Sequence, residues 1–305
     1  MSLPTAKTLI MTDSGCDLDR SLCERIGVVQ LPILVNLGDE IYTDRGNLQP
    51  PEFYRRIAAD RTLVPRTSQI PPADFIRAFE AALKDHEEIV YISFSSGLSG
   101  TCESARVARE TVAPERIHVV DSLSASVGQG LIVLAAAAMT KRGWSREQIV
   151  ATLGALTEHI EHLFVAGSLE MLRRGGRVSK TVAVLGGMLD VRPILHIQQG
   201  KIYPLENARG EKKALRRLVE LMSERGVRLA EQTIGLNYAG DRGIAERLRE
   251  QIASAFGCTK FVISEIGAAI GAHSGPGTVS VFFFNQLADN LPPDLGLDVL
   301  DLPAF

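Results

Sequence analysis

Cysteine is scarce in this 305-residue sequence, and the spacing of the four cysteines does not pair them. They are Cys16, Cys23, Cys102 and Cys258, with no C-x-x-C pair and no zinc-like spacing. The sequence therefore indicates neither a disulfide framework nor a zinc site, and a reducing compartment is expected. His159 and His162 stand three residues apart beside two glutamates. Because no third ligand is in view, we interpret them as part of a solvated helix end rather than a metal site.

Long apolar runs and an excess of positive charge are also absent. The nearest candidate for a membrane span, Leu131 to Met139, is much shorter than the roughly 18 residues that a span requires. Residues 1–10 lack a basic region followed by an apolar core, so no secretion signal is indicated. The net charge of −3 supplies no basic field for nucleic acid. We therefore expect a cytoplasmic protein without a transmembrane segment and without a nucleic-acid partner.

The most informative stretch is a turn that follows a buried strand. Ile89 to Phe94 has the composition of that strand and Glu103 to Thr111 that of a helix, so residues 95–101 form the strand-to-helix turn. This turn suits an anion such as a phosphate or a carboxylate. Its hydroxyl groups lie beside the unpaired amides of a helix start, and its glycines let the backbone approach a ligand closely. A simple turn with a helix cap is the alternative. The hydroxyl-bearing residues and glycines of this turn are Ser95, Ser96, Ser99, Thr101, Gly97 and Gly100.

Two other predicted strands, Thr8 to Met11 and Ile117 to Val120, are also followed by polar side chains, here carboxylates and hydroxyls. Strands alternate with helices throughout the first half of the chain, which predicts an open parallel sheet. In such a sheet ligands bind beyond the carboxyl ends of the strands, so we expect these loops to converge on one site. The carboxylates and hydroxyls that follow the two strands are Asp13, Ser14, Asp121 and Ser122.

Three polar features elsewhere are candidates for the same site. Thr67 and Ser68 lie in a proline-bounded loop, and they either cap the following helix or present hydroxyls to a ligand. Arg177 follows a double glycine and can swing toward a carboxylate or remain exposed. His273 lies in a small glycine-rich loop that includes Gly275. Because the backbone of such a loop must come close to something, we favour a site over a structural role for this histidine.

Length, composition and element order predict a two-domain α/β protein. Apolar residues make up 45% of the chain, an ordinary value for a globular protein, and 305 residues suffice for two cores. The predicted first domain, residues 1–160, is a parallel-sheet α/β/α unit. A smaller α+β unit follows over residues 161–286, and residues 287–305 form a tail.

Six motifs, in order across most of the chain, carry a family resemblance. Together they resemble the DegV family of bacterial fatty-acid-binding proteins, the acyl carriers of the fatty acid kinase system. The resemblance implies a long-chain fatty acid in a tunnel between two α/β domains and a fatty acid kinase as partner. It implies no catalytic residue, no cofactor and no metal, and it is compatible with transient contact at a membrane surface. The motifs are T-D-S-G-C-D-L (12–18), T-S-Q (67–69), S-S-G-L-S-G-T (95–101), V-V-D-S (119–122), L-x-x-L-x-x-G-G-R-V-S (169–179) and G-A-H-S-G-P-G (271–277).

Matching the motifs residue by residue implies a set of ligands for the fatty acid carboxylate. The set comprises Thr67, Ser68, one or more of Ser95, Ser96 and Ser99, and His273, with Arg177 in support. The loops expected to support it contain Asp13, Ser14, Gly97, Asp121, Ser122 and Gly275.

Two other functions could use the same residues. A serine hydrolase, an esterase or thioesterase, would take Ser95 or Ser96 as nucleophile, His273 as base, and Asp13 or Asp121 to orient that base. The absence of a G-x-S-x-G nucleophile elbow counts against it. Binding of a nucleotide or phosphate at residues 95–101 is the weaker alternative, because the chain contains neither G-x-x-x-x-G-K-[ST] nor G-x-G-x-x-G.

Overall fold

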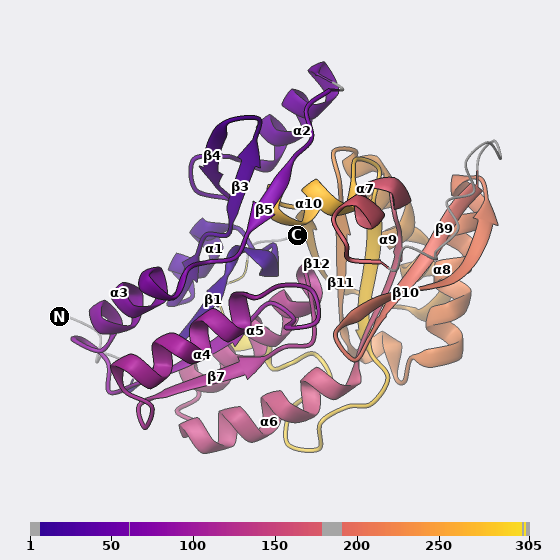
Figure 1. Ribbon diagram of the computed structural model, residues 1–305. Helices are drawn as coiled ribbons and strands as arrows, with labels where there is room; N and C mark the ends of the chain where they lie inside the picture. Colours follow the sequence, from indigo (N-terminus) through magenta and orange to yellow (C-terminus); the bar gives the residue numbers. More distant parts are fainter. Residues whose placement is uncertain (1–6, 61, 179–190, 301, 303–305) are drawn as a thin grey trace.

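The computed structural model describes residues 7–60, 62–178, 191–300 and 302. Two sheets lie side by side with helices against them, and a small third sheet stands beyond the first (Figure 1). The predicted fold class, a parallel-sheet α/β unit followed by a second sheet-rich unit, is confirmed. Ser179 of the fifth motif and the last residues of the predicted tail lie outside the described residues.

The first sheet contains four parallel strands in the order β2-β1-β6-β7. Both faces are covered, which explains the continuous apolar runs in the sequence. Met11 and Tyr91 belong to the core on one face, beneath α3 (Pro72–Ala82) and α4 (Thr101–Val112). Ile10 and Val90 belong to the core on the other face, beneath α5 (Val127–Lys141) and α6 (Arg146–His159). The strands are β1 (Thr8–Asp13), β2 (Val28–Leu31), β6 (Glu88–Ser93) and β7 (Ile117–Asp121).

The second sheet contains six strands in the order β10-β9-β8-β13-β11-β12. β11 and β12 are parallel, and the other neighbours are antiparallel. Helices α8 (Glu211–Arg225) and α9 (Arg242–Phe256) cover its outer face. A register shift after Pro204 lets β9 and β10 pair as far as Arg209. The strands are β8 (Ile160–Val165), β9 (Val191–Gln198), β10 (Lys201–Arg209), β11 (Thr233–Tyr238), β12 (Lys260–Glu265) and β13 (Val279–Phe284).

Helix α5 lies between the two sheets (Figure 1). Every residue from Val127 to Met139 is buried. The helix contacts β1 and β6 of the first sheet and β8, β11, β12 and β13 of the second. A helix that is apolar all round needs partners on all sides, which explains the run from Leu131 to Met139. Since both sheets pack on the same helix, α5 fixes their relative positions. Among the described helices, none is both long and apolar enough to cross a membrane.

The small third sheet is antiparallel, in the order β4-β3-β5. The chain from Val28 to Leu37 forms two strands on either side of Pro32, and they join different sheets. Thr67 pairs with Val35 across β5 and β3, so the loop predicted around Thr67 and Ser68 is a strand. The strands of this sheet are β3 (Leu34–Leu37), β4 (Glu40–Thr43) and β5 (Arg66–Ser68). The remaining helical elements of the first half are α1 (Arg20–Arg25), α2 (Pro50–Ala59) and the 3₁₀ turn η1 (Ser14–Cys16).

Two short helices, α7 (Leu169–Arg174) and α10 (Ala268–Ser274), pack against each other between the two halves of the molecule (Figure 1). The prediction of a loop around His273 is therefore wrong. Small residues let α10 approach its neighbours closely: a Cβ atom at Gly271 would lie 2.6 Å from the Tyr54 hydroxyl. The remaining 3₁₀ turns are η2 (Leu229–Glu231) and η3 (Leu297–Val299).

We expect the Leu134→Ala variant to lower the free energy of unfolding by about 2–5 kcal/mol, because it leaves a cavity in a helix that is packed on all sides. Urea unfolding followed by circular dichroism measures this loss. Val107→Ala in α4 is the control, since Val107 is 47% exposed and its truncation should change stability by less than about 0.5 kcal/mol. Equal losses in the two variants would contradict the central packing role of α5.

Candidate functional site

A cavity lies between the loops of the first half and the inner face of the second sheet. It contains about 930 Å³ of empty space, including its open mouth. Most of its wall is apolar. Phe164, Ile197 and Phe282 come from the second sheet, and Phe94 and Leu98 come from the turn after β6. The predicted convergence of strand-end loops on one site is therefore found in part, because the loops after β6 and β7 both reach this cavity.

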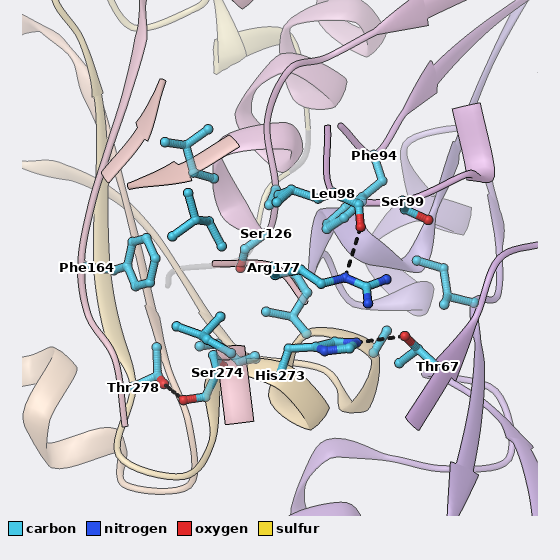
Figure 2. A pocket seen from close by; sticks show the side chains of 18 of the residues that line it. Thr67, Phe94, Leu98, Ser99, Ser126, Phe164, Arg177, His273, Ser274 and Thr278 are labelled. Atoms are coloured by element: carbon cyan, nitrogen blue, oxygen red, sulfur yellow. Dashed lines mark hydrogen bonds between the residues drawn. The ribbon is translucent and has the colours of Figure 1, made fainter. Parts of the chain in front are cut away.

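The polar end of the cavity joins residues from α10 and β5 (Figure 2). His273 Nε2 and Thr67 Oγ1 are 2.8 Å apart and hydrogen-bonded. Ser68 and Ser99 also line the cavity, and the Ser99 hydroxyl lies 2.9 Å from that of Thr101. Four members of the predicted ligand set thus line the same cavity although they lie up to 206 residues apart in sequence. The exposed Ser68 hydroxyl accepts from the Asn36 side chain at 3.3 Å.

Arg177 extends across the same end of the cavity (Figure 2). Its Nε donates to the Leu98 carbonyl at 3.1 Å, and its Nη1 donates to the Gly175 carbonyl. The side chain is half-buried, and burial lowers the pKa of its guanidinium. Among the described residues no carboxylate forms an ion pair with it. A desolvated cation that has only carbonyl partners is available to bind an anion.

His273 is neutral near pH 7. Burial, and then the charge of Arg177, lowers its pKa to about 4. Its Nδ1 is buried and has no hydrogen-bond partner in the described part of the chain. A Cβ atom at position 175 would lie 2.1 Å from this nitrogen, so only glycine fits beside the ring. The imidazole is therefore held between α7 and β5 and acts as a hydrogen-bonding group rather than as a charge.

Ser95 and Ser96 are not in the cavity wall. The Ser95 side chain is buried, and its hydroxyl donates to the Gly200 carbonyl at 2.7 Å. Ser96 is exposed, and its amide donates to Asp121 Oδ1 at 3.1 Å. A Cβ atom at Gly97 would lie 2.5 Å from the Gly200 carbonyl oxygen, so glycine is required where the β9–β10 hairpin touches this loop. These residues shape the loop that presents Ser99.

Asp13 ties the ends of two neighbouring strands together. Its carboxylate accepts hydrogen bonds from the Tyr91 hydroxyl at 2.6 Å and from the amides of Phe94 and Gly15 at 2.9 and 3.0 Å. Complete burial raises its pKa although these donors oppose the shift. The Asp13 carboxylate thus fixes the start of the loop that carries Phe94, Leu98 and Ser99.

The other predicted supporting residues also hold loops in place. Ser14 Oγ accepts from the Ile33 amide at 3.0 Å, and the Ser122 hydroxyl donates to the Ser124 carbonyl at 3.3 Å. Asp121 Oδ1 accepts from the Leu123 amide at 3.1 Å. Gly275 has a φ of +79°, which lets the chain leave α10 toward β13.

Several polar residues of the cavity wall were not predicted from the sequence. Ser280 lines the cavity and is the single polar residue of the buried strand β13, a signal that the sequence contained. The interpretation of His162 as part of a solvated helix end is wrong: it belongs to β8, is buried, and lies 2.5 Å from the Ser124 hydroxyl. Burial lowers its pKa to about 3. In the described ranges, no group of three or more His, Cys, Asp or Glu residues could hold a metal ion. The unpredicted polar residues are Gln69, Ser126, His162, Asn237, Ser274, Thr278 and Ser280.

A second, outer hollow reaches the same polar end from the surface. It contains about 720 Å³ of empty space and shares Thr67, Arg177 and His273 with the cavity. Arg66 and Arg174 also line it, and none of its described lining residues is acidic. A group bound at the polar end would therefore lie beside a basic depression.

A serine hydrolase arrangement is not assembled. Ser95 donates to a carbonyl, His273 bonds to Thr67, and Asp13 accepts from Tyr91. The Ser96 amide donates to Asp121, but no hydrogen bond between described residues joins either of them to His273. The hydrogen bond between nucleophile and base, which identifies such a site, is absent from the described residues.

Comparison with known proteins gives the family of this chain. A family model described as an uncharacterised protein of the DegV family matches residues 7–286. A DegV domain-containing protein of Caldanaerobacter subterraneus is 35% identical over 277 residues, which cover 91% of this chain and 98% of that relative.

Two solved structures share the fold at moderate sequence identity. A DegV family protein from Thermus thermophilus, described as binding fatty acid, is 33% identical with a TM-score of 0.84, over 90% of this chain and 98% of that one. DegV of Bacillus subtilis, described as a fatty acid binding protein, is 30% identical with a TM-score of 0.80 and the same coverage. The match of the family model over nearly the whole length, with the 35% identity of the first relative, shows that this chain belongs to the DegV family.

Proposed function

We propose that the protein binds a long-chain fatty acid in the cavity and holds its carboxylate at the polar end. One observation carries the proposal: Arg177, a half-buried cation without an ion-pair partner in the described residues, stands at the polar end of an apolar cavity. The fatty-acid binding described for the relatives from Thermus thermophilus and Bacillus subtilis supports the same ligand class.

The apolar wall supplies the affinity. Burying an acyl chain gains about 0.8 kcal/mol per methylene, so ~15 methylenes contribute about 12 kcal/mol before the costs of association. Side chains such as Phe164, Ile197, Ile202 and Phe282 offer that surface from the second sheet. Selection between acyl chains and other apolar ligands then depends on the polar end.

The polar end compensates for the desolvation of the carboxylate. Arg177 supplies the positive charge and a fork of N–H donors that fits a carboxylate. Thr67 and the neutral His273 supply hydrogen bonds, and the Ser99 hydroxyl lies in the same wall. An acid is preferred over a neutral lipid because a carboxylate would give the half-buried Arg177 the counter-ion that the described residues do not supply.

The family resemblance further leads us to propose that the protein presents the bound acid to a fatty acid kinase and carries out no chemistry itself. The outer hollow supports this proposal. It opens beside Thr67, Arg177 and His273, and its Arg66 and Arg174 would attract a phosphate-bearing partner to the head group.

The Arg177→Ala variant tests the proposed function. We expect it to weaken palmitate binding by about tenfold to a hundredfold while binding of 1-hexadecanol changes by less than about threefold, because only the acid needs the charge. Displacement of a fluorescent lipid measures both affinities, and mass spectrometry of an organic extract shows whether the wild type carries fatty acid. Arg173→Ala is the matched control, since Arg173 is paired with Glu170 and lines neither hollow. A wild type that binds neither lipid would contradict the proposal.

Carboxylate binding should change the protonation of His273. In the free protein its pKa is about 4, below the ordinary value, so the neutral form is favoured and stability falls as pH drops from about 6.5 toward 4. A carboxylate placed beside the ring raises the pKa, so binding near pH 5 takes up protons. Imidazole NMR with and without palmitate measures the shift, and His273→Gln identifies the signal. Identical titration midpoints in both states would place the carboxylate elsewhere.

We expect no Ser95-dependent or Ser96-dependent turnover of p-nitrophenyl palmitate, because neither hydroxyl is bonded to His273. The assay compares the wild type with Ser95→Ala and Ser96→Ala at equal concentration. Turnover that a single one of these changes abolishes would restore the hydrolase alternative.

A further inference from the structure

A buried cluster of charges lies outside the cavity, where the first half of the chain meets helix α10. We call Asp17, Asp44 and Arg45 the Asp17 cluster. Their exposed fractions are 0%, 1% and 4%, and none of them lines the cavity. Asp17 follows η1, and the other two follow β4, so the cluster belongs to the N-terminal half.

Both carboxylates of the cluster accept hydrogen bonds from the first amides of α10. Asp17 Oδ1 accepts from the Gly267 amide at 2.7 Å, and Asp44 Oδ1 accepts from the Ala268 amide at 2.7 Å. These amides lie at the cap and the first residue of the helix, where intrahelical partners are lacking and negative charge is favoured.

Arg45 fixes the approach to the same helix. Its guanidinium lies 3.5 Å from Asp17 Oδ1 and donates to the Glu265 carbonyl, two residues before the helix cap. It also pairs with Asp19, whose side chain is 72% exposed. The Tyr54 hydroxyl donates to the Ile266 carbonyl at 3.0 Å, so four consecutive residues before and at the helix start have partners in the N-terminal half.

The far end of α10 carries His273. A helix of seven residues is about 10 Å long, so a tilt of ~10° about its start would move its far end by about 1.7 Å. Such a displacement would break the 2.8 Å contact between His273 and Thr67. The orientation of the imidazole at the polar end therefore depends on how the first turn is held.

We propose that Asp17 and Asp44 are positioning residues for carboxylate recognition: by capping α10 from the N-terminal half, they hold His273 opposite Thr67. This inference rests on the proposed function, since it concerns the same polar end.

Stability alone is a poor explanation for the Asp17 cluster. Buried ion clusters often contribute less than apolar side chains of the same volume, because desolvation offsets the attraction between the charges. The cost is visible here, since burial raises the pKa of Asp17 to about 7 even though Arg45 opposes the shift. Apolar side chains at these positions could not accept the two amides, so the carboxylates are needed to hold the start of α10.

Three variants test the inference. Asp44→Ala removes the acceptor of the Ala268 amide, whereas Asp44→Asn keeps a carbonyl oxygen that can replace it. Asp19→Asn is the matched control, because Asp19 also pairs with Arg45 but none of the hydrogen bonds between described residues joins it to α10. Affinities for palmitate and 1-hexadecanol are measured for each variant, and the ratio of the two reports head-group recognition separately from acyl-chain binding.

We expect Asp44→Ala to weaken palmitate binding by about tenfold or more while 1-hexadecanol binding changes by less than about threefold. Asp44→Asn and Asp19→Asn should keep the wild-type ratio. If Asp44→Ala does not fold, Asp44→Ser, whose shorter side chain does not reach the amide, is measured instead.

Two results would overturn the inference: unchanged affinities for both lipids in the Asp44→Ala or Asp44→Ser protein, or an equal loss for both lipids, which would mean a general structural role. Failure of the proposed function is distinguishable from both, because the wild type itself would then show no preference for the acid.

Discussion

The packing of one helix against two sheets is the constraint on which the cavity depends. Because α5 is buried between the first and second sheets, their relative positions are set by close packing rather than by a flexible hinge. The wall formed by Phe164 and Phe282 therefore stays opposite the loops after β6 and β7. An apolar cavity remains open inside a close-packed protein only if its walls are held apart, and α5 supplies that support.

The polar end is a meeting point of short elements that are individually weak. β5 has three residues, α7 six and α10 seven, and none of them would be stable in isolation. Each is held by longer-range contacts: Thr67 through pairing with β3, Gly175 through contact with His273, and α10 through Asp17 and Asp44. The geometry of the head-group site is thus a product of tertiary structure, and changes far from the ligand can alter it.

The sequence predicted those parts of the structure whose signals are local. The sequence predicted the buried strands and the polar loops that follow them around Asp13, Ser99 and Asp121, because apolar runs and turn residues follow one another there. The sequence did not predict that Thr67 lies in a strand. A strand of three residues shows no periodicity, and Val35, with which Thr67 pairs, lies 32 residues away. The glycines around His273 favoured a loop, so the helix that carries this residue was not predicted. The contact of Asp17 with Gly267, 250 residues away, has no signal in the local sequence.

The division of roles between Arg177 and His273 follows from their different responses to burial. An arginine stays protonated when half-buried, so Arg177 keeps its charge whether or not an acid is present. A histidine in the same environment loses its proton, and the charge of Arg177 favours that loss. Without a bound acid, the polar end then contains one positive charge, that of Arg177, instead of two like charges. In the proposed function, a carboxylate at this end would neutralise Arg177, and its negative charge would raise the pKa of the imidazole. Under the proposed function, Arg177 therefore supplies the permanent charge for an ionised head group, and the imidazole supplies hydrogen bonding.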